Sequence, residues 1–188
     1  MSVRLLLATR NAHKVREFER LLPGLELDPL PADVVTPPET GTTYADNALI
    51  KARAAAAATG RAAIADDSGV EAEALGGRPG VRSARFAGAD ASDGENLAKL
   101  RREAPPGSRL EYVCVIAHVA PGGEETLFYG RCAGTMAAEG AGTRGFGYDP
   151  VFVPDGERRT MAELGDEEKD AISHRGLAAR ALLEWLGA

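Results

Sequence analysis

Apolar and polar positions follow one another in blocks along this chain, and the blocks predict strands and helices in turn. The apolar run Val3–Ala8 predicts a buried strand. Apolar residues then recur at helical spacing over Val15–Leu22, and Asn11 is placed to cap the start of that helix. The segment Leu25–Leu30 predicts a further short strand.

The next part of the chain alternates between loop, helix and strand. The polar segment 31–43 contains two consecutive prolines and predicts a loop. A helix is predicted over Tyr44–Thr59, ended by Gly60. The apolar run Ala62–Ala65 predicts a buried strand that stops at a polar edge, and the glycine-rich residues 69–90 predict an irregular segment.

The second half predicts a helix and a β-hairpin. The helix covers Asp93–Glu103 and is capped by Ser92 or Asp93. Leu110–Ala120 and Glu125–Ala137 are long β runs, and the Pro-Gly-Gly turn between them is a hairpin signal. Strand–helix alternation followed by a hairpin predicts an α/β fold with a mixed sheet.

The C-terminal part predicts a brief strand over Val151–Val153 and then two helical pieces. Thr160 and Glu163 have the spacing of a capping box, which predicts a helix start. Ser173 is placed to cap the final helix. This last helix is predicted to bury Leu177, Ala181, Leu182 and Trp185.

Composition narrows the class of protein. A chain of 188 residues fits one large domain or two small lobes that share a core, and we expect residues 1–188 to form a single domain. The net charge of −6 disfavours nucleic acid as a partner. The apolar start is too short for a signal peptide or a membrane span. Cys114 and Cys132 lie in apolar runs and predict buried thiols, which suits a reducing cytoplasm.

The most informative motif is a pair of adjacent acids, Asp66 and Asp67, followed by Ser68 and Gly69. Two carboxylates at the end of a strand would repel each other unless a cation lies between or beside them. Such a pair suits Mg²⁺, and Glu39 in the preceding loop could complete the site. The alternative is an ordinary turn with a glycine.

Four other clusters could bind parts of a nucleotide, and two of them suit its phosphates. The turn Thr9–Lys14 opens a helix whose free amides and dipole favour phosphate, although an ordinary capped helix would look the same. Asn47 and Lys51 share one helix face, from which Lys51 could reach a phosphate or simply lie in solvent.

The other two clusters suit the nucleobase of a nucleotide. The segment Gly145–Pro150 places two aromatic rings among glycines, which could form a slot for a base or a tight turn. Lys169, His174 and Arg175 could donate to a purine oxygen or a phosphate, or be solvated beside a helix cap.

In this order, these pieces resemble the inosine triphosphate pyrophosphatase family, also called Ham1-like or XTP/dITP diphosphatases. The ordered set covers almost the whole chain and is far more specific than any one motif. The matching residues are Ala8-Thr9-Arg10-Asn11 with Lys14, Glu39-Thr40-Gly41, Asn47-Ala48 with Lys51-Ala52, Ile64-Ala65-Asp66-Asp67-Ser68-Gly69, Leu75-Gly76-Gly77, Pro79-Gly80, Ser83-Ala84-Arg85, Gly145-Phe146-Gly147-Tyr148-Asp149-Pro150 and Ala171-Ile172-Ser173-His174-Arg175-Gly176.

The resemblance implies an ITPase-like α/β fold, with an elongated mixed sheet flanked by helices and two lobes with the active cleft between them. It implies a cytoplasmic homodimer that needs Mg²⁺ and binds purine nucleoside triphosphates, without nucleic acid or a membrane as partner. The implied reaction hydrolyses ITP, dITP or XTP to the monophosphate and pyrophosphate, which cleanses the nucleotide pool. Alternatives are a Maf-like pyrophosphatase for modified pyrimidine nucleotides and a non-enzymatic nucleotide sensor.

The resemblance also implies residue roles. Asp67 is the expected general base and a metal ligand, and Glu39 is the second metal ligand. The residue between Thr9 and Asn11 is commonly glycine in the family, so Arg10 must either point away from the phosphates or join in binding them. The expected triphosphate residues are Thr9, Arg10, Asn11, Ala12, His13, Lys14, Lys51 and Ser68, and the expected base-pocket residues are Phe146, Gly147, Tyr148, Asp149, Lys169, His174 and Arg175.

Overall fold

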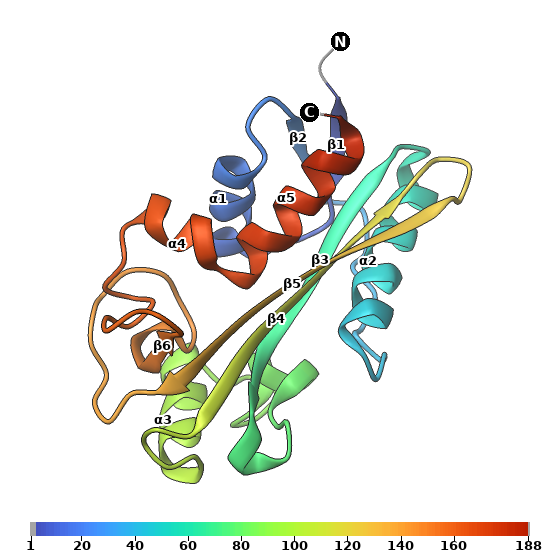
Figure 1. The fold of residues 1–188 in the computed structure, drawn as a ribbon. Helices are drawn as coiled ribbons and strands as arrows, with labels where there is room; N and C mark the ends of the chain where they lie inside the picture. The colour runs from blue at the N-terminus through green and yellow to red at the C-terminus, as the bar shows by residue number, and fades with distance from the viewer. Residues whose placement is uncertain (1–2, 188) are drawn as a thin grey trace. The chain divides into compact units, whose positions relative to one another are not determined.

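A six-stranded mixed sheet organises the protein, as the computed structural model of residues 3–187 shows (Figure 1). The strand order is β2-β1-β3-β4-β5-β6. Strand β1 is parallel to both of its neighbours, β2 and β3, whereas β5 and β6 are antiparallel. The α/β fold with a mixed sheet and flanking helices is therefore confirmed.

The regular elements lie close to their predicted positions. The strands are β1 (Arg4–Leu7), β2 (Glu26–Pro29), β3 (Ala63–Ala72), β4 (Arg109–Val119), β5 (Glu125–Met136) and β6 (Phe152–Pro154). The α-helices are α1 (Ala12–Leu21), α2 (Tyr44–Thr59), α3 (Asp93–Glu103), α4 (Asp166–Ile172) and α5 (His174–Leu186), and the 3₁₀ turns are η1 (Glu73–Leu75), η2 (Gly80–Arg85) and η3 (Asp149–Val151).

Side-chain caps begin three of these helices, and two of the caps, Asn11 and Ser92, were predicted. The Asn11 side chain accepts hydrogen bonds from the backbone amides of His13 and Lys14 at the start of α1. Helices α2 and α3 begin with reciprocal capping boxes, led by Thr43 and Ser92. Local hydrogen bonding of this kind needs only neighbouring residues, which explains why the sequence located these boundaries.

The chain forms two compact units, and several strands contribute residues to both. Unit 1 comprises residues 3–67, 114–130 and 177–187, and unit 2 comprises residues 68–113 and 131–176.

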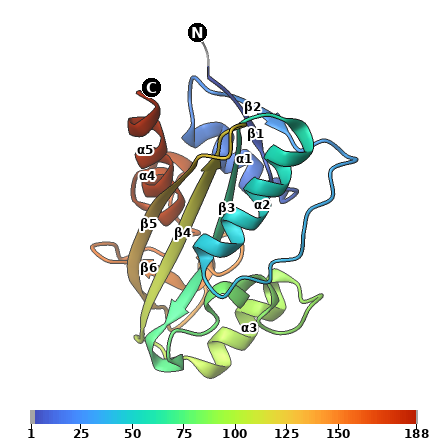
Figure 2. The ribbon, with the colours of Figure 1, turned by 90° about the vertical axis from the view of Figure 1, so that its right-hand side faces the viewer.

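In unit 1, helices cover both faces of the sheet, as Figures 1 and 2 show from two directions. Helix α2 packs its alanines, such as Ala48 and Ala52, against Leu6 of β1 and Ala65 of β3. Helices α1 and α5 pack on the opposite face, where Phe18 is fully buried among strand residues. Because side chains alternate along a strand, neighbouring residues of β1 and β3 belong to these different layers.

Unit 2 has a separate apolar core. Residues from β3, β4, β5 and β6 meet helix α3 there, and Leu100, Phe152 and Met161 are completely buried. Tyr112 of β4 also belongs to this core and packs on Phe152, with ring centroids 4.4 Å apart. The first part of strand β4, which carries Tyr112, is therefore packed in this core. Tyr112 also takes part in the polar cluster described below.

The prediction for the strand at Ala62–Ala65 was wrong in its length. Strand β3 continues through Asp66, Asp67, Ser68 and Gly69 to Ala72, so the acids lie inside a strand and not at its end. The hydrophobic pattern could not reveal this, because the polar residues of the strand are balanced by partners from distant parts of the chain.

Two expectations for the C-terminal part also need correction. Thr160 does not begin a helix: its amide donates to Glu163 Oε2 at 2.7 Å, but the segment is a turn and α4 starts at Asp166. Ser173 does cap α5, since its Oγ accepts from the amide of Gly176. The buried residues of α5 in unit 1 are Ala178, Ala179 and Leu182, whereas Leu177 is 36% and Trp185 50% exposed.

Both cysteines are buried free thiols, as expected. Burial is the main reason that the pKa of Cys132 rises to about 11. None of the helices within residues 3–187 is both long enough and apolar enough to cross a bilayer.

Gly69 provides a direct test of the packing of β3. A Cβ atom at this position would overlap the carbonyl oxygen of Gly80 and the hydroxyl of Ser83, and a backbone carbonyl cannot easily move. We expect Gly69→Ala to lower the free energy of unfolding by about 1–3 kcal/mol. Urea unfolding of both proteins measures this difference.

Gly94 in α3 is the matched control, because a Cβ there meets nothing within 4 Å. Gly94→Ala should leave stability unchanged or raise it by up to about 1 kcal/mol, since alanine restricts the unfolded chain. Equal losses in both variants would contradict the proposed steric role of Gly69.

Candidate functional site

The turn after β1 is built by hydrogen bonds that shape the start of helix α1. Thr9 Oγ1 accepts from the amide of Asn11 at 3.2 Å, and Asn11 Oδ1 accepts from the amides of His13 and Lys14. Ala12 is the first residue of α1, so the positive end of the helix dipole lies at this turn. The structure thus places Thr9–Lys14 as one helix-opening turn, the geometry that favours an anion.

Strand β3 directs its two adjacent acids to opposite faces of the sheet. Asp66 follows the alternation of Ile64 toward the α1 layer, and Lys14 Nζ of α1 lies 2.9 Å from Asp66 Oδ2. Asp67 follows Ala65 toward the α2 layer, where Asn47 Nδ2 of α2 donates to Asp67 Oδ2 at 2.9 Å. Lysine ammonium groups provide positive charge beside both carboxylates: Lys14 forms an ion pair with Asp66, and the charge of Lys51 acts on Asp66 and Asp67.

The Asp67 carboxylate is 5% exposed, and this burial is the largest cause that raises its pKa. The positive charge of Lys51 and the hydrogen bond from Asn47 act in the opposite direction, whereas the charge of Glu39 raises the pKa further. Asp67 is thus a buried carboxylate held by an amide and surrounded by charges of both signs.

Lys51 lies at the centre of this charge cluster. Its Nζ atom is 2.5 Å from Glu39 Oε1 and the side chain is almost buried. Burial acts to lower the pKa of Lys51, but the negative charges of Asp66, Glu39 and Asp67 outweigh it and raise the pKa. The carboxylates of unit 1 therefore stabilise a positive charge at this position.

Two carboxylates of this cluster, Glu39 and Asp67, could hold a divalent cation together with ligands from outside the protein. Among residues 3–187, no three His, Cys, Asp or Glu side chains are arranged to hold a metal ion by themselves. Mg²⁺ commonly binds through one or two carboxylates, with water and phosphate oxygens as the other ligands. Glu39 and Asp67 provide such a pair of oxygen donors on the α2 side of the sheet.

A second polar cluster lies in unit 2 and is centred on Asp149, which is 3% exposed. Its Oδ2 atom is 2.7 Å from Lys169 Nζ and accepts from the amide of Phe146 at 3.0 Å. Its Oδ1 atom accepts from the hydroxyl of Tyr112 at 3.0 Å. Asp149 therefore fixes Lys169 and the Phe146 turn, rather than presenting an unengaged acceptor.

Close packing around Asp149 explains the glycine before Phe146. Gly145 has a φ of 70°, and a Cβ there would overlap Asp149 Oδ2 and lie 3.0 Å from Lys169 Nζ. The Phe146 ring in turn has Lys169 Nζ 5.4 Å and Arg175 Cζ 5.7 Å from its centroid. Two cations thus lie over this aromatic ring.

The start of helix α5 places two further predicted base-pocket residues, His174 and Arg175, in unit 2. The His174 ring stacks on Tyr112, with centroids 4.5 Å apart and an interplanar angle of 8°. Arg175 is 1% exposed and its Nη2 donates to Ser68 Oγ at 2.7 Å. Unit 2 therefore brings together residues that are 107 positions apart in the sequence.

The second aromatic residue of the Gly145–Pro150 segment is Tyr148, which is buried. Tyr148 is 5% exposed, belongs to the apolar core of unit 2 and donates its hydroxyl to the carbonyl oxygen of Ser83. Gly147, its neighbour, donates its amide to Asp93 Oδ2 at 3.1 Å.

Sequence reasoning did not assign two residues that organise these clusters. Asn47 was noted only for its spacing from Lys51, yet it joins Asp67 to the amide of Gly41. Tyr112 was placed only within a β run, yet it contacts both Asp149 and His174. Its polar hydroxyl within a buried strand was the available signal.

Comparisons with known proteins identify the family of this chain. A model of the Ham1 family matches residues 5–185. The dITP/XTP pyrophosphatase of Symbiobacterium thermophilum is 50% identical over 189 residues, which cover 98% of this chain and 95% of that protein. The corresponding enzyme of Frankia alni is 47% identical over 193 residues, covering 96% of this chain and 95% of that protein.

Solved structures show the same fold. The HAM1 protein of Coxiella burnetii superposes with a TM-score of 0.87 at 40% identity, with 98% of both chains covered. A nucleoside-triphosphatase (dITP/XTP pyrophosphatase) of Mycobacterium abscessus gives a TM-score of 0.75 at 46% identity, covering 96% of this chain and 99% of that one. Sequence and fold together show that this chain belongs to the Ham1 family.

Proposed function

We propose that this protein is a Mg²⁺-dependent diphosphatase that hydrolyses the non-standard purine nucleotides dITP, XTP and ITP to the monophosphate and pyrophosphate. The observation that carries the proposal is Lys51 placed among Asp66, Glu39 and Asp67, because such a cluster suits a cation and a polyphosphate. Relatives named dITP/XTP pyrophosphatase match almost the whole chain and supply the substrate class.

The residues of unit 1 suit the triphosphate. The start of α1 offers a helix dipole, with Lys14 and Lys51 as nearby point charges. Glu39 and Asp67 would hold Mg²⁺, which when bound neutralises phosphate charge and polarises the phosphoryl oxygens. Lys51 then exchanges its contact with Glu39 for a phosphate oxygen, so the positive charge of the ammonium stays compensated.

Asp67 is the proposed general base. Its carboxylate accepts a proton from a water molecule whose oxygen attacks the α-phosphorus, and the bond to the leaving pyrophosphate breaks. Asn47 orients Asp67 by donating to Oδ2. Asp66 takes a supporting role, since it holds Lys14 on the other face of the sheet.

The residues of unit 2 suit a 6-oxo purine. Lys169, His174 and Arg175 are donors gathered beside the Phe146 ring. A carbonyl at position 6 of the base accepts from such donors, whereas the amino group of adenine would face a donor and leave it unsatisfied. Ser68 and Asp149 hold two of these donors in place.

We also propose a homodimer that acts in the cytoplasm and removes deaminated purines from the nucleotide pool. The exposed Tyr129 and Trp185 side chains of unit 1 suit a protein contact, since aromatic residues are enriched in interfaces. The free, buried thiols of Cys114 and Cys132 suit a reducing compartment.

A panel of triphosphates tests the substrate class. With Mg²⁺ present, dITP and XTP should be hydrolysed with a kcat/KM on the order of 10² or more above that of ATP. Pyrophosphate release is the measurement, and chelation of Mg²⁺ should abolish it. Equal rates for dITP and ATP would disprove the selectivity, faster cleavage of methylated pyrimidine triphosphates would favour the Maf-like alternative, and tight binding without turnover would indicate a sensor.

Replacement of Asp67 tests the proposed base. Asp67→Asn should lower kcat by about 10²–10⁴-fold, the usual contribution of a general base. The fold should persist, because the new amide oxygen can still accept from Asn47. The exposed Asp90 gives the matched control, so Asp90→Asn should retain the wild-type kcat. Full turnover by Asp67→Asn would refute the assignment.

Tyr112 provides a test of the base pocket. Tyr112→Phe removes the donor to Asp149, so the KM for dITP should rise several-fold with little change in kcat. Thr160→Val is the control, since it removes another buried hydroxyl of unit 2, one that donates to the carbonyl oxygen of Ala141. Each variant should lose about 0.5–1.5 kcal/mol of stability, the usual value of one hydrogen bond. An equal rise of KM in both variants would mean that the effect of Tyr112→Phe comes from a general loss of stability and not from the base pocket.

A further inference from the structure

Arg10 contacts a loop rather than its own helix. Its Nη2 atom lies 3.1 Å from the carbonyl oxygen of Pro31, 3.4 Å from that of Ala32 and 2.7 Å from that of Val34. Loop carbonyls have no regular partners, so a guanidinium that bonds several of them can fix the path of the chain. Arg10 thereby connects the turn after β1 to the start of the loop between β2 and α2.

The same loop is fixed at its other end by α2. The amide of Gly41 donates to Asn47 Oδ1 at 2.8 Å. A Cβ at Gly41 would lie 2.7 Å from that oxygen and 2.5 Å from the Cβ of Asp46, so the loop approaches the helix closely here. Glu39 therefore lies in a segment that is anchored on both sides, by Arg10 before it and by Asn47 after it.

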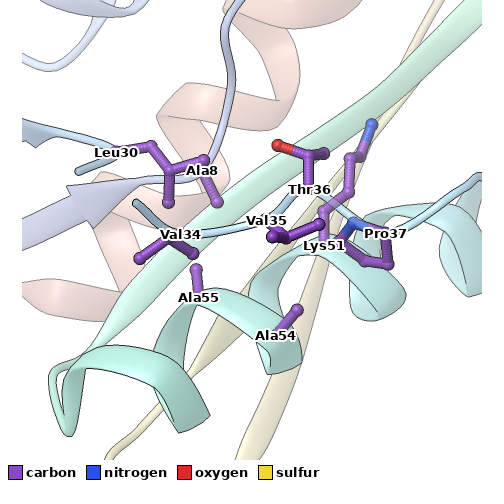
Figure 3. Close-up of a pocket in the computed structure, with 9 residues that line it drawn as sticks. All are labelled: Ala8, Leu30, Val34, Val35, Thr36, Pro37, Lys51, Ala54 and Ala55. Carbon is purple, nitrogen blue, oxygen red and sulfur yellow. The ribbon is translucent and has the colours of Figure 1, made fainter. Parts of the chain in front are cut away.

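The segment between the anchors also packs on α2. Val34 is 9% exposed and belongs to the apolar layer that contains Ala55. Figure 3 shows Val34 directed toward Ala55, with Thr36 and Pro37 beside the stem of Lys51. A shift of the loop at Val34 would thus change how Glu39 approaches Lys51.

We propose that Arg10 is a positioning residue that holds the loop 31–41 so that Glu39 is presented to the cation and to Lys51. This inference rests on the proposed function for the role of Glu39. A preordered loop loses less conformational entropy when the cation and the triphosphate bind.

Hydrogen exchange tests the tether without any ligand. In the Mg²⁺-free, nucleotide-free protein, Arg10→Met should raise amide exchange in residues 32–42 about fivefold or more, because local opening becomes easier. Exchange in α3 of unit 2 should not change. Arg16→Met is the matched control, since it removes an exposed arginine of α1 that contacts His13 and not the loop.

The Mg²⁺ dependence of dITP hydrolysis tests the effect on Glu39. For Arg10→Met, the Mg²⁺ concentration at half-maximal rate should rise about tenfold, as for other residues that orient metal ligands. The KM for dITP at saturating Mg²⁺ should change much less. Arg10→Lys should lie between Arg10→Met and the wild type, because an ammonium can still donate to a loop carbonyl.

Hydrogen exchange and the kinetics of dITP hydrolysis together show which part of the proposal is wrong if an expected result is not found. A raised KM for dITP at saturating Mg²⁺, with loop exchange unchanged, would mean that Arg10 binds phosphate, and it would overturn the proposal. Faster loop exchange with an unchanged Mg²⁺ requirement would overturn the role in presenting Glu39. If the wild-type protein does not cleave dITP, the proposed function fails, and the exchange experiment still decides whether Arg10 holds the loop.

Discussion

The burial of two adjacent carboxylates within β3 is the constraint on which unit 1 depends. Asp66 and Asp67 are 1% and 5% exposed, and an uncompensated charge in such a place costs several kcal/mol. Compensation comes from Lys14 of α1 on one face and from Asn47 and Lys51 of α2 on the other. The strand can therefore keep its acids only while both helices are in place, so packing and charge depend on each other.

This arrangement gives neighbouring acids different surroundings. Because successive strand residues point to opposite faces, Asp66 meets the ammonium of Lys14, whereas Asp67 meets the neutral amide of Asn47. The pKa of Asp67 is raised chiefly by burial. The charge of Lys51 and the hydrogen bond from Asn47 oppose this effect of burial.

A carboxylate also organises unit 2, although its partners differ. Asp149 is engaged by Lys169, Tyr112 and the amide of Phe146, and it has little capacity left for a ligand. The result is a set of donors whose positions are fixed before any ligand arrives. Such preorganisation favours discrimination between bases, because an unmatched donor cannot easily turn away.

The sequence by itself determined what depends on neighbouring residues. The Asn11 cap, the end of α2 at Gly60, the β4–β5 hairpin and the family were all predicted correctly. Contacts between distant residues decided the rest: β3 continues through its acids because Lys14 and Asn47 reach them, and Arg10 turns to the loop because Val34 lies there. Local hydrogen bonds depend on residues that are close in the sequence, so a short segment predicts them. The compensation of a buried charge depends on distant residues, which meet only once the chain has folded.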